Sequence, residues 1–234
     1  MLSVNNLNAW YGPSHVLQGI RFEVKAGEVV CLLGRNGAGK TTTIKSIMGL
    51  IGKTTGNVSF KGEELLTRPA HDRFKRGLAY VPEERRIVPG LTVLENIRLG
   101  IIASPHKARE KEIIEQIADT FPRLKERLNQ MAVTMSGGEQ QMLAIARAMA
   151  SDPDMILLDE PSEGIMPILV DEMFELFAQL KKAGKTIFLV EQNVELALGI
   201  SDRAYILDQG AIVHTDSARN LLDDPEIQER YCAV

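Results

Sequence analysis

Cysteine is scarce in this chain of 234 residues, which contains two. Cys31 lies within the apolar run Val29–Leu33, where a small buried side chain is expected. Cys232 lies almost at the other end of the chain. A disulfide-stabilised secreted fold is therefore not expected, and a reducing compartment is the better match.

Long hydrophobic runs are also missing. No apolar stretch approaches the roughly 18 residues that a membrane-spanning helix needs. The first residues, Met1 to Asn6, show neither the basic stretch nor the apolar core of a secretion signal. We expect a soluble chain that would reach a membrane only through a partner.

An excess of basic residues is absent as well. Lys and Arg number 27 against 31 Asp and Glu, which gives a formal net charge of −4. This balance argues against a protein that binds nucleic acid by neutralising phosphates, so no nucleic-acid partner is expected. The hydrophobic content of 44% is ordinary for a globular protein, and there are no repeats or low-complexity stretches.

Apolar periodicity indicates strands alternating with helices, which predicts an α/β fold with a mostly parallel sheet. Between about 92 and 128 the period is helical throughout, which indicates a helical lobe inserted into the core. We expect a single domain over 1–234, with a core at 1–85 and 151–234 and a lobe at about 86–150. Strands are predicted at 16–24, 29–33, 58–60, 78–81, 155–158, 186–190, 204–207 and 211–213, and helices at 39–50, 137–150, 168–182 and 194–200.

A glycine-rich segment between a buried strand and a helix matches G-x-x-x-x-G-K-[ST], the phosphate-binding P-loop. Its glycines let backbone N–H groups turn toward an anion at the helix N-terminus. Lys40 would reach the β- and γ-phosphates of a nucleotide, and the Thr41 hydroxyl would bind Mg²⁺. The predicted nucleotide-binding residues here are Gly34, Arg35, Asn36, Gly37, Ala38, Gly39, Lys40, Thr41 and Thr42.

The apolar run Met155–Leu158 ends in two acids, Asp159 and Glu160. The carboxyl edge of a parallel sheet is where a metal-directed carboxylate is expected in such proteins. Asp159 would hold Mg²⁺ and Glu160 would act as general base on the attacking water. The alternative is a surface acid pair that caps the next turn.

The segment Ser136-Gly137-Gly138-Glu139 precedes an apolar helical run and has the spacing of a helix capping box. A simple cap does not call for two glycines in the first turn, because glycine weakens a helix. The glycines are explained if a phosphate approaches the bare helix end. Since the P-loop already holds the phosphates from one side, this second anion site is predicted to serve a nucleotide bound by another subunit.

The ordered set of P-loop, Ser136–Gln140 and Leu158–Pro161 resembles the ABC ATPase family across essentially the whole chain. The resemblance implies a P-loop NTPase core with an N-terminal antiparallel part and an inserted helical lobe. It also implies ATP and Mg²⁺ as cofactors and two cassettes packed head to tail. Tyr11 would match the aromatic residue that stacks on adenine, the alternative being an ordinary core tyrosine.

Three positions depart from the family pattern. Glu83 replaces the usual Gln after Val-Pro, Gln192 replaces the usual His, and Met166 replaces the usual Asp. Glu83 can bind Mg²⁺, and Gln192 can donate to the γ-phosphate but cannot carry a proton near neutrality. These departures, together with Glu84-Arg85-Arg86 and the ending from Asp223 to Tyr231, resemble the LivF-type subunits of branched-chain amino-acid importers.

The resemblance implies an ATPase that powers import of branched-chain amino acids from the cytoplasmic face of the cell membrane. Its implied partners are a second ABC ATPase subunit, hydrophobic permease subunits and, indirectly, a substrate-binding protein. Two alternatives stay open: a related importer of urea or amides, and a soluble ABC ATPase in cofactor assembly. The residues expected in catalysis are Glu160, Lys40 and Gln192.

Overall fold

The computed structural model describes residues 1–102, 104, 107–224, 226–227 and 229. Cys232 and Tyr231 lie outside the described residues, as does Pro225, so the resemblance drawn from the end of the chain falls partly beyond them. No described helix is both long and apolar enough to cross a membrane.

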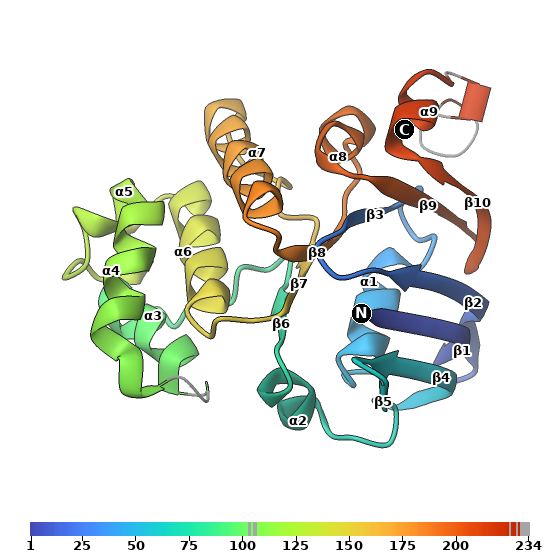
Figure 1. Ribbon diagram of the computed structural model, residues 1–234, viewed down its shortest axis with the longest axis horizontal. Helices are drawn as coiled ribbons and strands as arrows, with labels where there is room; N and C mark the ends of the chain where they lie inside the picture. Colours follow the sequence, from blue (N-terminus) through green and yellow to red (C-terminus); the bar gives the residue numbers. More distant parts are fainter. Residues whose placement is uncertain (103, 105–106, 225, 228, 230–234) are drawn as a thin grey trace.

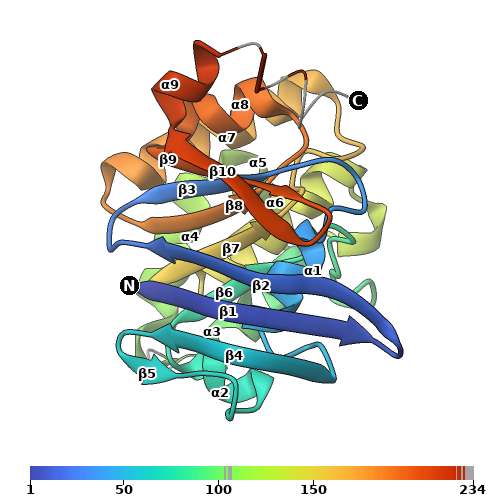
Figure 2. The same cartoon turned by 90° about the vertical axis from the view of Figure 1, so that its right-hand side faces the viewer.

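The strands form two sheets (Figures 1 and 2). One sheet is antiparallel in the order β2-β1-β4-β5 and the other has the order β10-β9-β3-β8-β7-β6. In the second sheet β9, β3, β8, β7 and β6 are parallel, and β10 pairs antiparallel with β9. The strands are β1 (Leu2–Tyr11), β2 (Ser14–Val24), β3 (Val29–Leu33), β4 (Lys53–Phe60), β5 (Glu63–Glu64), β6 (Leu78–Val81), β7 (Met155–Asp159), β8 (Thr186–Val190), β9 (Arg203–Asp208) and β10 (Ala211–Ser217).

The central strands β3, β7 and β8 are buried at every position and are mostly apolar, as is typical of a parallel sheet that is covered on both faces. Along β3, Val30 and Leu32 belong to a core shared with the antiparallel sheet and α1 (Lys40–Ile47). The alternate residues Val29, Cys31 and Leu33 belong to a second core on the opposite face. Successive side chains of β3 thus point to opposite faces of the sheet, and the sheet separates the two hydrophobic cores.

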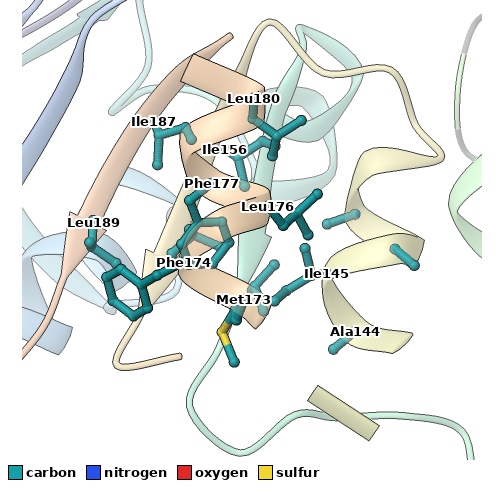
Figure 3. Close-up of a cluster of buried hydrophobic side chains, with 14 of the residues drawn as sticks. Ala144, Ile145, Ile156, Met173, Phe174, Leu176, Phe177, Leu180, Ile187 and Leu189 are labelled. Carbon is teal, nitrogen blue, oxygen red and sulfur yellow. The ribbon is translucent and has the colours of Figure 1, made fainter. Parts of the chain in front are cut away.

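The second core lies under α6 (Gly137–Met149), α7 (Pro167–Lys182) and α8 (Val194–Ile200). Figure 3 shows Phe174 and Phe177 of α7 lying over Ile187 and Leu189 of β8, with Ile145 of α6 beside them. The lobe on the left of Figure 1 contains α3 (Val93–Ile102), α4 (Glu110–Thr120) and α5 (Pro122–Lys125). Helices α3 and α5 contact α6, and α4 contacts α3 and α5. The remaining elements are α2 (Ala70–Lys75), α9 (Ala218–Leu222) and the 3₁₀ turns Lys107–Arg109 and Ala132–Thr134.

The predicted fold class is confirmed: an α/β core with a mostly parallel sheet, an antiparallel N-terminal part and a helical lobe. The strand pattern missed β1, and it recognised only the end of β4, because both carry polar stretches beside their apolar positions. The helix predicted at 39–50 ends at Ile47, and Gly49 follows in a left-handed conformation (φ +73°) that stops it.

Candidate functional site

The glycine-rich loop joins β3 to α1 and takes its shape from glycines in left-handed conformations. The φ angles are +80° at Gly37 and +110° at Gly39, which is the N-cap of α1. A side chain at Gly34 would collide with the carbonyl oxygen of Leu207 in β9. The loop therefore presents bare backbone at the N-terminus of α1, which is a favourable place for phosphate.

The Lys40 side chain is buried and folds back over this loop. Its ammonium donates hydrogen bonds to the carbonyl oxygens of Gly34 (2.8 Å) and Arg35 (3.3 Å). It also lies 3.2 Å from Oε1 of Glu160. The ammonium thus stands between the loop and the acidic end of β7, where an incoming phosphate would compete with Glu160 for it.

Asp159 ends β7 as a fully buried carboxylate with two hydroxyl donors. Thr41 Oγ1 donates to Oδ1 and the Tyr80 hydroxyl donates to Oδ2, each at 3.0 Å. Burial raises the pKa of Asp159, although these two bonds lower it in part. Thr41 and Asp159 lie side by side as the P-loop interpretation requires, and a bound cation would favour the ionised carboxylate.

Glu160 follows with a left-handed backbone (φ +45°), an uncommon conformation for a residue with a side chain. Its backbone N–H donates to the Val190 carbonyl at the end of β8 (2.8 Å). Its Oε2 accepts a 2.5 Å hydrogen bond from Nε2 of Gln192. The side chain faces a cavity of about 550 Å³ that is also lined by Lys40, Thr41, Tyr11 and Glu83.

No three His, Cys, Asp or Glu side chains within the described ranges form a ready-made metal cluster. A Mg²⁺ ion commonly takes one or two protein ligands and completes its shell with phosphates and water. The hydroxyl of Thr41 and the carboxylate of Asp159 are oxygen ligands of the right chemistry for such a shared site.

Ser136 caps α6 with both halves of a capping box. Its Oγ accepts from the Glu139 backbone N–H, and its own N–H donates to Glu139 Oε2 (2.9 Å). Arg127 holds the other carboxylate oxygen at 2.9 Å. The segment Ser136–Glu139 does not line the cavity of Lys40, and α6 and α1 pack in cores on opposite faces of the large sheet. One copy of the chain therefore does not bring its P-loop and its capped glycines together.

Comparison with known proteins shows which family this chain resembles. The family model described as ABC transporter matches residues 17–163. A high-affinity branched-chain amino acid transport ATP-binding protein of Pseudomonas aeruginosa is 43% identical over 231 residues, which cover 99% of both chains. A probable LivF protein of Archaeoglobus fulgidus is 37% identical, with 99% of this chain and 98% of the relative covered. A lipopolysaccharide export ATP-binding protein of Haemophilus influenzae is 34% identical, with 99% and 96% covered.

The chain belongs to the ABC transporter family. It is an ATPase subunit of the ABC type, as the sequence predicted. A nucleotide-free cassette of an ABC transporter superposes with a TM-score of 0.84 at 27% identity, covering 98% of this chain and 97% of that one. A dimeric bacterial ABC cassette superposes with a TM-score of 0.80 at 28% identity, covering 94% and 99%.

The three departures from the usual ABC pattern fall in different places. Glu83 lines the P-loop cavity, and within the described part of the chain it pairs with neither Arg85 nor Arg86. Glu83 is exposed overall, but partial desolvation and the carboxylates of Glu160 and Asp159 raise its pKa. Gln192 contacts Glu160, and Met166 is exposed as the N-cap of α7.

Gly137 and Gly138, the two glycines at the start of α6, have close neighbours in their own chain that the sequence did not reveal. A Cβ at Gly138 would overlap the end of the Leu169 side chain of α7 and crowd Ile165, so these side chains would have to shift whatever binds at the helix end. The guanidinium of Arg85 fills the space beside Gly137. Both glycines therefore have close neighbours within their own chain, and the approach of a phosphate to them stays a prediction.

Sequence reasoning missed Tyr80, Glu191 and Arg85 as members of this region. Tyr80 ends up beside Asp159 because β6 and β7 are adjacent parallel strands. Glu191 is a buried acid one residue past β8 whose carboxylate binds backbone N–H groups of two loops. A charged residue directly after an apolar strand was the available signal for Glu191, and nothing local marked Tyr80 or Arg85.

Proposed function

We propose that this cassette hydrolyses ATP to power an importer of branched-chain amino acids. The observation that carries the proposal is the 43% identity, over 99% of both chains, to an ATP-binding protein of high-affinity branched-chain amino acid transport. Identity to the lipopolysaccharide export relative is lower, at 34%. The proposed location is the cytoplasmic face of the membrane, where the chain docks on hydrophobic permease subunits served by a substrate-binding protein.

The proposed nucleotide site uses the groups around the P-loop cavity. The backbone of 34–42 and the Lys40 ammonium hold the phosphates, and Tyr11, half exposed at the cavity wall, stacks on adenine. Thr41 and Asp159 hold Mg²⁺, which neutralises phosphate charge when bound, and Glu83 supplies a further oxygen. Glu160 orients and polarises the attacking water, with Gln192 holding its carboxylate.

The proposed working form contains two cassettes. Ser136, Gly137, Gly138 and Glu139 of one cassette complete the site formed by the P-loop of the other. The support is that these residues do not line the cavity of Lys40 in their own chain, and that a similar cassette has been solved as a dimer. Each nucleotide would then lie between the core (1–85 and 151–234) of one cassette and the lobe (about 86–150) of the other.

Uptake of radiolabelled leucine tests the proposal. Cells that carry the chain with its own permease and binding protein should take up leucine, and replacing the chain with Glu160→Gln should abolish uptake at equal protein level. Unlabelled isoleucine and valine should compete, whereas urea and small amides should not. Uptake of radiolabelled urea without uptake of leucine would assign the chain to an amide importer, and activity that fractionates away from any permease would support a soluble ABC ATPase.

A further inference from the structure

Glu191 is a buried carboxylate that directly follows β8. Its exposed fraction is 2%, and within the described ranges no Lys, Arg or His side chain lies at ion-pair distance from it. Burial raises the pKa of Glu191, as expected for an ionisable group moved out of water. Such a group is costly to bury, so a structural or functional reason for its presence is expected.

Backbone N–H groups of two loops, together with the Ser162 hydroxyl, take the place of a counter-ion. Oε1 of Glu191 accepts a hydrogen bond from the Ser162 N–H at 3.0 Å. Oε2 accepts from the N–H groups of Gln192 at 3.0 Å and Asn193 at 3.3 Å. One oxygen therefore holds the loop that follows β7, and the other holds the loop that follows β8.

The same two loops carry the pair Glu160 and Gln192. Glu160 lies two residues before Ser162, and Gln192 directly follows Glu191. Glu160 is therefore held at its backbone N–H by Val190, at its carboxylate by Gln192, and through its loop by Glu191. Its left-handed conformation is strained for a non-glycine residue and persists only when the surroundings enforce it.

We infer that Glu191 is a positioning residue for hydrolysis: its carboxylate fixes the loop after β7 against the loop after β8 so that Glu160 and Gln192 face the nucleotide together. The inference rests on the proposed function and adds a residue to it. Glu191 touches neither nucleotide nor water in this role. It acts through Glu160.

The substitution Glu191→Gln removes one acceptor and nearly preserves volume. An amide has one acceptor oxygen, and its NH₂ group faces an N–H donor, so the tie to one loop is lost. We expect kcat to fall about 10²-fold, the effect of misplacing a catalytic group by about 1 Å. ATP affinity should be unchanged, because the bonds around Lys40 and Thr41 do not involve Glu191.

A second variant and a control separate positioning from folding. Glu191→Asp keeps the negative charge, but its shorter side chain does not reach the Ser162 N–H as well. It should therefore show the same loss of kcat while the fold is retained. Glu195→Gln removes an equal charge from the exposed first turn of α8 and should leave kcat unchanged.

The deciding experiment is a double-mutant cycle of ATPase rates measured on the full-length chain. Glu191→Gln should slow the unmodified chain, yet it should leave the residual rate of Glu160→Gln unchanged, because groups that act as a unit are non-additive. An equal loss in both backgrounds, or no loss in either, would overturn the inference. A Glu160→Gln chain that retains its rate would instead overturn the proposed role of Glu160, and the positioning role with it.

Discussion

At the scale of single residues, Glu160 is held from three directions in a conformation that its side chain disfavours. If it is the general base, Glu160→Gln should slow ATP turnover by about 10²–10⁴-fold, the usual contribution of positioned acid–base catalysis. ATP binding should persist, and an ATP-bound dimer should accumulate if, as we propose, the two cassettes separate only after hydrolysis. Phosphate release and gel filtration measure both effects. Turnover near that of the unmodified chain would assign the role to another group.

Glu83 is a second residue whose surroundings predict a measurable effect. Partial desolvation of this exposed residue and the nearby carboxylates of Glu160 and Asp159 raise its pKa, so its ionised form is less favourable than in water and a bound cation would stabilise it. As pH rises above the ordinary range of a glutamate, the empty site gains repulsion that Mg²⁺ relieves. ATP-driven dimerisation of the Glu160→Gln chain should therefore depend steeply on Mg²⁺, and adding Glu83→Gln should flatten the dependence.

Dimer fraction against Mg²⁺ concentration, at fixed ATP and at two pH values, measures this effect. The difference between the two chains should be larger at the higher pH, where Glu83 is ionised. Arg86→Gln is a suitable control, because Arg86 is exposed and its Nε lies 3.5 Å from the carboxylate of Glu84 rather than that of Glu83. It should leave the Mg²⁺ dependence unchanged. Coincident curves with and without Glu83→Gln would place the carboxylate away from the metal.

At the scale of elements, the contact between α6 and α7 depends on Gly138. Alanine usually stabilises a helix relative to glycine by about 1 kcal/mol. At Gly138 the added Cβ would overlap Leu169 and crowd Ile165, so Gly138→Ala should destabilise the fold by about 1–3 kcal/mol. Gly199→Ala in α8, where a Cβ meets nothing within 4 Å, should stabilise it slightly instead. Urea unfolding of both variants measures the difference, and a shift of the same sign in both would contradict the packing argument.

At the scale of the whole molecule, the P-loop cavity and the capped end of α6 lie apart, and we propose that they belong to different composite sites. A Lys40→Ala chain should fail to bind ATP, and a Ser136→Arg chain should fail to complete its neighbour's site. A mixture of the two should recover roughly a quarter of the unmodified rate, because half of randomly paired dimers contain one intact site of two. ATPase assays on each chain and on the mixture measure this. An inactive mixture with demonstrated pairing would rule out the shared site.

Much of this organisation follows from local sequence. The P-loop and the Ser-x-x-Glu cap each depend on residues within eight positions of one another, so much of their backbone geometry is set by local steric and hydrogen-bond rules. The acid pair is recognisable from the apolar run before it, although the backbone conformation of Glu160 depends on distant neighbours. The fold class follows in the same way from alternating periodicities. The predicted strands at 29–33, 78–81 and 186–190 agree with β3, β6 and β8.

The tertiary structure alone decided which distant groups meet. Tyr80 reaches Asp159 across 79 positions, and Glu191 binds the Ser162 N–H across 29, because adjacent parallel strands bring their carboxyl ends to one edge of the sheet. The contact of Arg85 with Gly137 likewise depends on how the loop after β6 meets the start of α6. No periodicity or motif encodes such contacts, because each depends on strand order and packing, which are properties of the whole chain.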